Sequence, residues 1–259
     1  MKRLSNTILV VRTIIFYLGY ILLTGWFSTT GIVFFRFFPL AIRGRYLIVW
    51  NRWTLAWLRL SCGVRYRIVG RVPEGHYVVM AKHQSQWETF YLQYAFFPIG
   101  IVLKQELLKM PFFGWGLRLV DPIAIDRGNP KAALRHLMDE GVRRLRQGRR
   151  VLIFPEGTRT PVGQAGSYAR SGANIAIATG AAVVPVAHNA GQCWPARKFL
   201  KHPGTITVFI GEPIASDGKN SRELTDGVRQ WIEQKTREAE RLNDPRAPSN
   251  FPTEDIASG

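Results

Sequence analysis

Two short stretches of this chain carry residue types that could do chemistry together. The first contains His83 and, five positions later, Glu88, within the run Lys-His-Gln-Ser-Gln-Trp-Glu. An imidazole can accept a proton at neutral pH, and a carboxylate can orient it through the second ring nitrogen. The second stretch is 154–159, Phe-Pro-Glu-Gly-Thr-Arg, whose backbone amides, hydroxyl and guanidinium suit an anion. Together they predict a base beside an anion-binding turn.

The elements that must position these groups can be read from the apolar pattern. Each stretch follows a short apolar run, 77–80 or 151–154, which is typical of a buried parallel strand with reactive groups on the loop that follows. Similar runs predict further strands at 66–69, 99–104, 122–125, 182–186 and 205–210. Helical patterns alternate with them at 130–147, 168–179 and 221–239. We therefore expect an α/β fold with a mostly parallel central sheet flanked by helices.

In order and spacing these motifs resemble the signature of the glycerolipid acyltransferases, the family that includes lysophosphatidate acyltransferase. His83 to Glu88 is similar to the family's first block, a histidine, four residues and an acid, and 154–159 is identical to its third. Residues 123–127, Ile-Ala-Ile-Asp-Arg, and 184–188, Val-Pro-Val-Ala-His, resemble the second and fourth. The resemblance extends from about residue 63 to about residue 215.

The chain departs from the family pattern at two positions of the first block. Glu88 stands where the family usually has aspartate, which keeps the charge and lengthens the arm by one methylene. Orienting an imidazole requires reach and angle, so we expect glutamate to serve. Lys82 stands where the family usually has asparagine, which leaves open which polar group steadies the loop.

The resemblance implies an activity. A fatty acyl group would pass directly from a thioester of acyl-carrier protein or coenzyme A to the sn-2 hydroxyl of 1-acyl-glycerol-3-phosphate, giving phosphatidate for phospholipid synthesis. His83 would take the hydroxyl proton, and Glu88 would hold the ring and stabilise the imidazolium. No cofactor or metal is implied, and the sequence shows no Gly-x-Ser-x-Gly nucleophile motif. An acceptor such as glycerol-3-phosphate or a lyso-aminolipid is the alternative.

The acceptor phosphate is expected at the second stretch. Gly157 lets the backbone approach closely, Thr158 offers a hydroxyl, and Arg159 can bind two phosphate oxygens through its planar fork. Glu156 is expected to orient the loop or a glycerol hydroxyl. These four residues form the centre of the predicted phosphate-binding set.

The resemblance adds two cations to this set. Arg127 ends the second block, and Lys104 lies where the family usually has a lysine-rich turn. Both would lie near the glycerol-phosphate part of the substrate. For Arg127 the alternative is an ordinary surface ion pair with Asp126.

Charge and composition narrow the function classes. The chain has 259 residues, 35 Lys and Arg against 18 Asp and Glu, and a net charge of +17. Such an excess suits an anionic surface, either nucleic acid or lipid headgroups. A membrane-anchored nucleic-acid-binding protein is therefore the alternative of a different class, although no groove-reading motif is present. Cys62 and Cys193 have neither metal-ligand spacing nor a disulfide-dense pattern and are expected to be buried, reduced thiols.

The amino-terminal residues predict a membrane-associated segment. Residues 13–35 contain no charged side chain and, at about 1.5 Å per residue, could cross a bilayer core. A break is expected in the middle, at 24–25 and 28–31, and basic residues flank both ends. These features favour a helical hairpin that returns to its side of entry over a single span. Residues 46–60, with Trp50, Trp53 and Trp57 on one face, predict an interfacial helix; packing of these tryptophans against the globular domain is the alternative.

These patterns predict that the chain is divided into three segments. Residues 1–62 are predicted as the membrane-associated hairpin and interfacial helix, 63–242 as the acyltransferase α/β domain, and 243–259 as a flexible tail. The expected partners are membrane lysophosphatidate and an acyl-thioester donor, with no nucleic acid. The expected location is the cytoplasmic face of a membrane, as in the bacterial inner membrane. The oligomeric state is left open.

Overall fold

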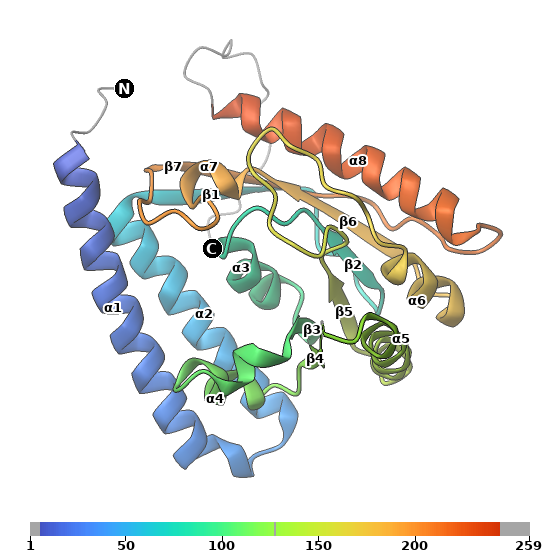
Figure 1. Cartoon of the computed structure of the whole chain (residues 1–259), viewed down its shortest axis with the longest axis horizontal. Helices are drawn as coiled ribbons and strands as arrows, with labels where there is room; N and C mark the ends of the chain where they lie inside the picture. The colour runs from blue at the N-terminus through green and yellow to red at the C-terminus, as the bar shows by residue number, and fades with distance from the viewer. Residues whose placement is uncertain (1–5, 127, 244–259) are drawn as a thin grey trace.

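The computed structural model describes residues 6–126 and 128–243, which fold around one central sheet (Figure 1). Its strands are β1 Val64–Val69, β2 Val78–Ala81, β3 Ile99–Lys104, β4 Ile123–Ile125, β5 Arg150–Ile153, β6 Val183–His188 and β7 Gly204–Ile210. Its α-helices are α1 Asn6–Val33, α2 Leu40–Cys62, α3 Trp87–Ala95, α4 Phe113–Arg118, α5 Pro130–Arg146, α6 Ser171–Thr179, α7 Ala190–Cys193 and α8 Ser221–Leu242, with 3-10 turns η1 Phe35–Phe37 and η2 Gln105–Lys109. Arg127 and positions 244–259 of the predicted tail lie outside the described residues.

The sheet has seven strands in the order β1-β7-β6-β2-β5-β3-β4. Neighbouring strands are parallel except for the antiparallel pair β6 and β7. Every residue of β2 and β6 is buried, as expected for strands covered on both faces. The predicted mostly parallel α/β fold is thus confirmed, and the strand and helix ends predicted beyond residue 63 shift by three residues at most. The helix predicted at 46–60 begins six residues earlier, at Leu40.

Helices cover both faces of the sheet, so the core has two parts. Val79 and Ala81 of β2 belong to the cluster that includes residues of α1, α2 and α3. Val78 and Met80 point the other way and join residues of α5, α6 and α8, because successive strand side chains alternate between faces. Figure 1 shows the same two layers, with α8 and α6 on one side of the sheet and α2 and α3 on the other.

The expected break within the amino-terminal apolar segment is wrong, because α1 runs without interruption from Asn6 to Val33. Its small polar residues fit a helix: the Thr24 hydroxyl donates to Tyr20 O at 2.7 Å, and the Thr30 hydroxyl donates to Trp26 O at 2.7 Å. The chain turns instead at η1, and α2 returns along α1 (Figure 1). A hairpin is present, and its two arms are α1 and α2.

The three tryptophans of α2 do not share one exposed face. Trp50 is buried and meets the Phe90 ring edge-on at 5.3 Å, and Trp57 Nε1 donates to Phe16 O of α1 at 3.1 Å. Trp53 is 59% exposed. At about 100° per residue, Trp53 lies about 60° around the helix from Trp50 and about 40° from Trp57. The packing alternative therefore holds for Trp50 and Trp57.

Candidate functional site

The candidate base lies on the loop between β2 and α3. The five-residue spacing places Glu88 in the first turn of α3, where a carboxylate is favoured by the helix dipole and by free amides. Its Oε1 lies 3.0 Å from His83 Nδ1 and accepts the N–H groups of Gln84 at 2.9 Å and Ser85 at 2.7 Å. One oxygen therefore holds both the imidazole and the loop that carries it.

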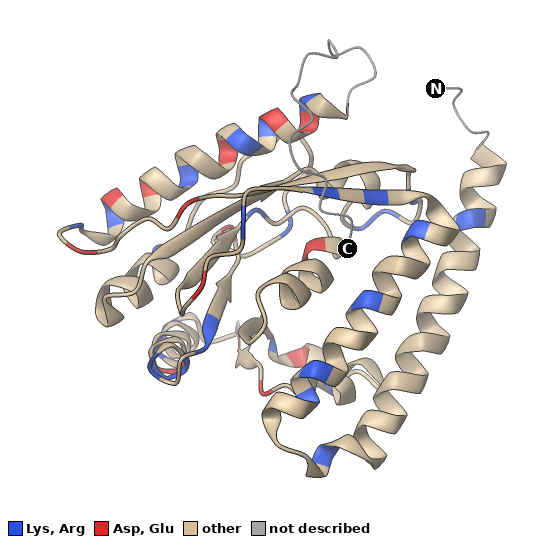
Figure 2. Cartoon of the chain, turned by 180° about the vertical axis from the view of Figure 1, so that it is seen from behind, with Lys and Arg blue, Asp and Glu red and all other residues tan. Residues whose placement is uncertain are grey.

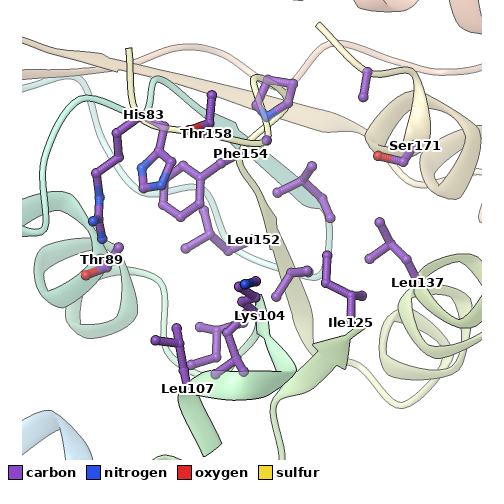
Figure 3. Close-up of a pocket in the computed structure, with 18 of the residues that line it drawn as sticks. His83, Thr89, Lys104, Leu107, Ile125, Leu137, Leu152, Phe154, Thr158 and Ser171 are labelled. Atoms are coloured by element: carbon purple, nitrogen blue, oxygen red, sulfur yellow. The ribbon is translucent and has the colours of Figure 1, made fainter. Parts of the chain in front are cut away.

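The surroundings of Glu88 favour its charged form. Burial raises the pKa of the Glu88 carboxyl, but its interactions with His188, His83 and the Ser85 N–H outweigh burial and hold the pKa below its usual value. An ionised Glu88 accepts the Nδ1 proton, which leaves the Nε2 lone pair of His83 free to act as a base. The ring of Phe154 stacks on the imidazole at 4.1 Å and fixes its plane. Figure 3 shows His83 at the pocket with Phe154 and Thr158 beside it.

A second histidine lies behind the pair without reaching the pocket. His188, at the end of β6, is fully buried; its Nε2 donates to Lys82 O at 2.9 Å and its Nδ1 accepts the Ala190 N–H at 3.2 Å. Burial lowers the pKa of His188, and its hydrogen bond to Lys82 O ties the end of β6 to the first loop. No role is predicted for this fourth block from sequence, because the partners of His188 are backbone atoms that leave no side-chain pattern to recognise.

The predicted anion-binding turn follows β5, the neighbour of β2 in the sheet, so the two loops adjoin at the same edge. Gly157 has φ of 65°, a left-handed conformation that favours glycine, and its N–H closes a turn on Phe154 O at 3.0 Å. Gly157 and Thr158 are exposed. Arg159 Nε donates to Ser85 O at 2.8 Å, which leaves its two terminal nitrogens for a ligand.

Glu156 faces away from the pocket and is buried. Its Oε2 accepts the His83 N–H at 2.9 Å, and its Oε1 accepts Thr160 Oγ1 at 3.0 Å and Lys82 Nζ at 2.8 Å. Of the two roles expected for Glu156, this geometry supports orientation of the loops.

Of the two cationic residues that the resemblance adds, Lys104 lies at the pocket, whereas Arg127 is not among the described residues. Lys104 ends β3, lines the pocket and pairs with Glu106 at 2.9 Å. Figure 3 shows it beside Leu107, apart from His83 and Thr158. Arg127 lies outside the described residues, so its predicted contact with phosphate stays a prediction. The carboxylate of Asp126 accepts the Gly128 N–H at 2.8 Å.

The candidate base and the predicted anion-binding turn open onto one cavity of about 640 Å³. Much of its lining is apolar and includes Ile101 and Leu103. Figure 3 shows Leu107, Ile125, Leu137 and Leu152 among the side chains that line the cavity. Four cationic side chains line it, namely Lys104, Arg159, Arg170 and Arg197, and no carboxylate is among its described lining residues. Sequence reasoning missed Arg170 and Arg197 because each lies on a loop outside the motifs.

Two further features concern metal ligands and thiols in the described part of the chain. Residues 6–126 and 128–243 contain no group of three or more His, Cys, Asp or Glu side chains placed to hold a metal ion. Cys62 and Cys193 are free and buried, which confirms the expectation of unpaired thiols.

The fold and the site are those expected of a transferase in which a candidate imidazole base and a predicted anion-binding turn share a largely apolar cavity. Residues 63–189 match the family model described as Acyltransferase. The chain is 44% identical over 236 residues to the 1-acyl-sn-glycerol-3-phosphate acyltransferase of Pseudomonas aeruginosa, covering 88% of this chain and 91% of that one. A protein of the same name from Helicobacter pylori is 34% identical over 115 residues, 44% of this chain and 48% of that one. This chain belongs to the acyltransferase family.

A solved structure agrees with this fold. The crystal structure of the 1-acyl-sn-glycerophosphate (LPA) acyltransferase PlsC from Thermotoga maritima matches with a TM-score of 0.72 at 24% identity, covering 93% of this chain and 98% of that one. At this identity the likeness concerns the fold. Family membership favours the enzyme over the nucleic-acid-binding alternative.

Proposed function

We propose that this protein is a 1-acyl-sn-glycerol-3-phosphate acyltransferase, which moves a fatty acyl group from a thioester to the sn-2 hydroxyl and forms phosphatidate. The observation that carries the proposal is the His83–Glu88 pair, set between the cationic turn and the apolar interior of one cavity. A phosphorylated lipid acceptor has this combination of an anion, a hydroxyl and an apolar chain. The Pseudomonas aeruginosa relative carries the same name.

The reaction can be written with the atoms of the site. His83 Nε2 takes the proton of the acceptor hydroxyl as its oxygen attacks the thioester carbonyl carbon. Glu88 stabilises the imidazolium through Nδ1. The tetrahedral intermediate collapses, the carbon–sulfur bond breaks, and the imidazolium returns its proton to the leaving sulfur. The donor is acyl-carrier protein or coenzyme A, and no other cofactor is needed.

The acceptor phosphate is proposed to bind Thr158 and the terminal nitrogens of Arg159, with Gly157 allowing close approach. The hydrogen bond from Arg159 Nε to Ser85 O supports this, because it ties the phosphate-binding arginine to the loop of the base. The place of Lys104 in the cavity supports its proposed interaction with the anionic part of a substrate. The proposed role of Arg127 rests on the sequence.

We place the enzyme on the cytoplasmic face of a membrane, such as the bacterial inner membrane. α1 is long and apolar enough to cross a membrane by length and composition, and its outer side chains Leu22 and Trp26 are 73% and 68% exposed. Arginines occur at both ends of the hairpin, among them Arg12 and Arg36, and an upright insertion would bury one set. These features favour a hairpin lying in one leaflet.

A direct assay tests the activity. Purified full-length protein in mixed lipid–detergent micelles is supplied with radiolabelled lysophosphatidate and, separately, acyl-coenzyme A or acyl-carrier protein. We expect labelled phosphatidate with at least one donor, and its loss in His83→Ala. The product is identified by mass spectrometry.

Two results would count against the proposal. Acylation of glycerol-3-phosphate or a lyso-aminolipid with no phosphatidate would assign another acceptor. Phosphatidate formed equally by wild type and His83→Ala would remove His83 as the base.

A further inference from the structure

Lys82 is a fully buried cation at the junction of three elements. Its Nζ donates to Glu156 Oε1 at 2.8 Å, to Glu233 Oε1 at 2.8 Å and to Gln164 O at 2.9 Å. An ammonium has three N–H donors, so all of them are used. Lys82 thereby joins the loop of the base, the anion-binding turn with its following residues, and helix α8.

This cluster continues directly to the base. Glu156, whose Oε1 accepts from Lys82, uses its Oε2 to accept the His83 N–H at 2.9 Å. Thr160 donates its N–H to His83 O at 2.8 Å and its hydroxyl to Glu156 Oε1 at 3.0 Å. Both polar groups of the His83 backbone are therefore held by residues of the second loop, and Lys82 orients the carboxylate that holds one of them.

Helix α8 takes part through two carboxylates on one face. Glu233 accepts from Lys82 and, at 2.9 Å, from the Tyr168 hydroxyl. Glu240 lies seven residues, or about two turns, further along. It accepts from Gln84 Nε2 at 2.9 Å and from the Gly163 N–H at 3.2 Å. α8 therefore contacts both loops of the site, although it lies beyond the residues that match the family model.

The charges make this arrangement depend on Lys82. Two carboxylates, Glu156 and Glu233, share one ammonium in an interior where an unpaired charge is costly. Removing the ammonium leaves two adjacent carboxylates that repel each other, and Glu156 can relieve this only by moving or by taking a proton. Either response disturbs the hydrogen bond to His83.

We propose that Lys82 is a positioning residue, whose ammonium, held between Glu156 and Glu233, fixes the His83 backbone against the anion-binding turn with α8 as its support. The inference rests on the proposed role of His83 as the base. It also answers what steadies this loop where lysine replaces the asparagine usual in the family. Misplacing a base by about 1 Å can lower a rate by about 100-fold, so the effect should fall on kcat.

The test uses full-length protein in mixed micelles with saturating lysophosphatidate and donor. Lys82→Met should lower kcat by about 10- to 100-fold while KM for each substrate stays within about twofold. Glu233→Gln keeps the shape of the side chain and should lower kcat less. The matched control is Glu238→Gln, on the same helix, whose partner is Lys235 at 2.7 Å; its kcat should stay within about twofold.

A double variant separates positioning from loss of fold. In Lys82→Met combined with Glu233→Gln, one of the two repelling charges is gone, so kcat should recover at least about threefold over Lys82→Met alone. Folded protein is quantified by thermal unfolding. Unchanged kcat per folded enzyme in Lys82→Met, or no recovery in the double variant, overturns the inference. Because His83→Ala is assayed in parallel, an active His83→Ala would instead overturn the assignment of the base.

Discussion

A single oxygen of Glu88 holds the proposed base, His83, and the loop that carries it. Its Oε1 receives His83 and two backbone N–H groups, while its Oε2 is buried with no hydrogen-bond partner among the described residues. Glu88→Gln should therefore lower kcat by about 10²- to 10⁴-fold, because an amide cannot stabilise the imidazolium. Steady-state kinetics at saturating substrate check this. Glu88→Asp keeps the charge and should retain more activity than Glu88→Gln; the reverse order would show that shape, and not charge, is the requirement.

The thiols offer a second residue-scale prediction. Burial raises the pKa of Cys193 to about 12, so this thiol stays protonated, and its reactive thiolate is scarce, at any pH well below that value. Treating the folded enzyme with a charged alkylating reagent at pH 7 to 8 should leave phosphatidate formation unchanged. Mass spectrometry would show whether Cys193 was modified. Inactivation that tracks modification of Cys193 would argue for a role in the reaction.

The site residues that could be predicted from the sequence are those whose partners lie close to them in the chain. His83 and Glu88 lie five positions apart, and the turn at 154–159 is contiguous, so both could be recognised as motifs. Lys82 and Glu233 are 151 positions apart, and no pattern predicts that a lysine beside the base meets a carboxylate on the last helix. The sequence leaves two roles open for Glu156 for the same reason, because its partners Lys82 and His83 are more than 70 positions away.

At the scale of elements, strands were easier to predict than the hairpin. The apolar runs of β2, β5 and β6 are short and bounded by polar loops, so the pattern alone is enough to predict these strands. Small and polar residues in α1 suggested a break, but such preferences are weak beside tertiary packing. Ser28 lies against Gly116 of α4, and Gly19 lies under Trp57 of α2. These small residues allow helices to approach, and they do not end α1.

The two glycines of α1 make this point testable. A Cβ added at Gly19 would lie 2.2 Å from Trp57 Nε1, whereas one added at Gly25 meets nothing within 4 Å. Gly19→Ala should destabilise the fold by about 1–3 kcal/mol through overpacking. Gly25→Ala, the matched control, should stabilise it by up to about 1 kcal/mol, because alanine favours helix. Thermal unfolding in detergent measures both, and equal shifts would mean that α1 and α2 do not pack as described.

At the scale of the whole molecule, the hairpin and the α/β part share one core. Phe16 of α1, Leu58 of α2 and Phe90 of α3 belong to the same buried cluster as the strands. Figure 2 shows α1 almost free of charged residues, basic bands along α2 and both signs along α8. Because α1 packs into the same core as the sheet, the apolar outer side of α1 and the two site loops are held at a fixed distance and orientation. A surface that binds α1 is therefore held in a fixed position relative to the cavity.

This arrangement predicts how the enzyme meets a membrane. If the hairpin lies in one leaflet, the two chain ends stay on the same side, and tags at both termini should resist protease added outside sealed spheroplasts.

The exposed side of α1 gives a second test. Leu22→Glu combined with Trp26→Glu should weaken binding to anionic vesicles in co-sedimentation, because charge replaces apolar contact. The matched control is Ile177→Glu, an exposed apolar residue of α6 on the other face of the sheet, which should bind as wild type. High salt should remove only the electrostatic share of binding. Cleavage of the amino-terminal tag alone would establish a single span, and unchanged binding of the Leu22 and Trp26 variant would place the contact surface elsewhere.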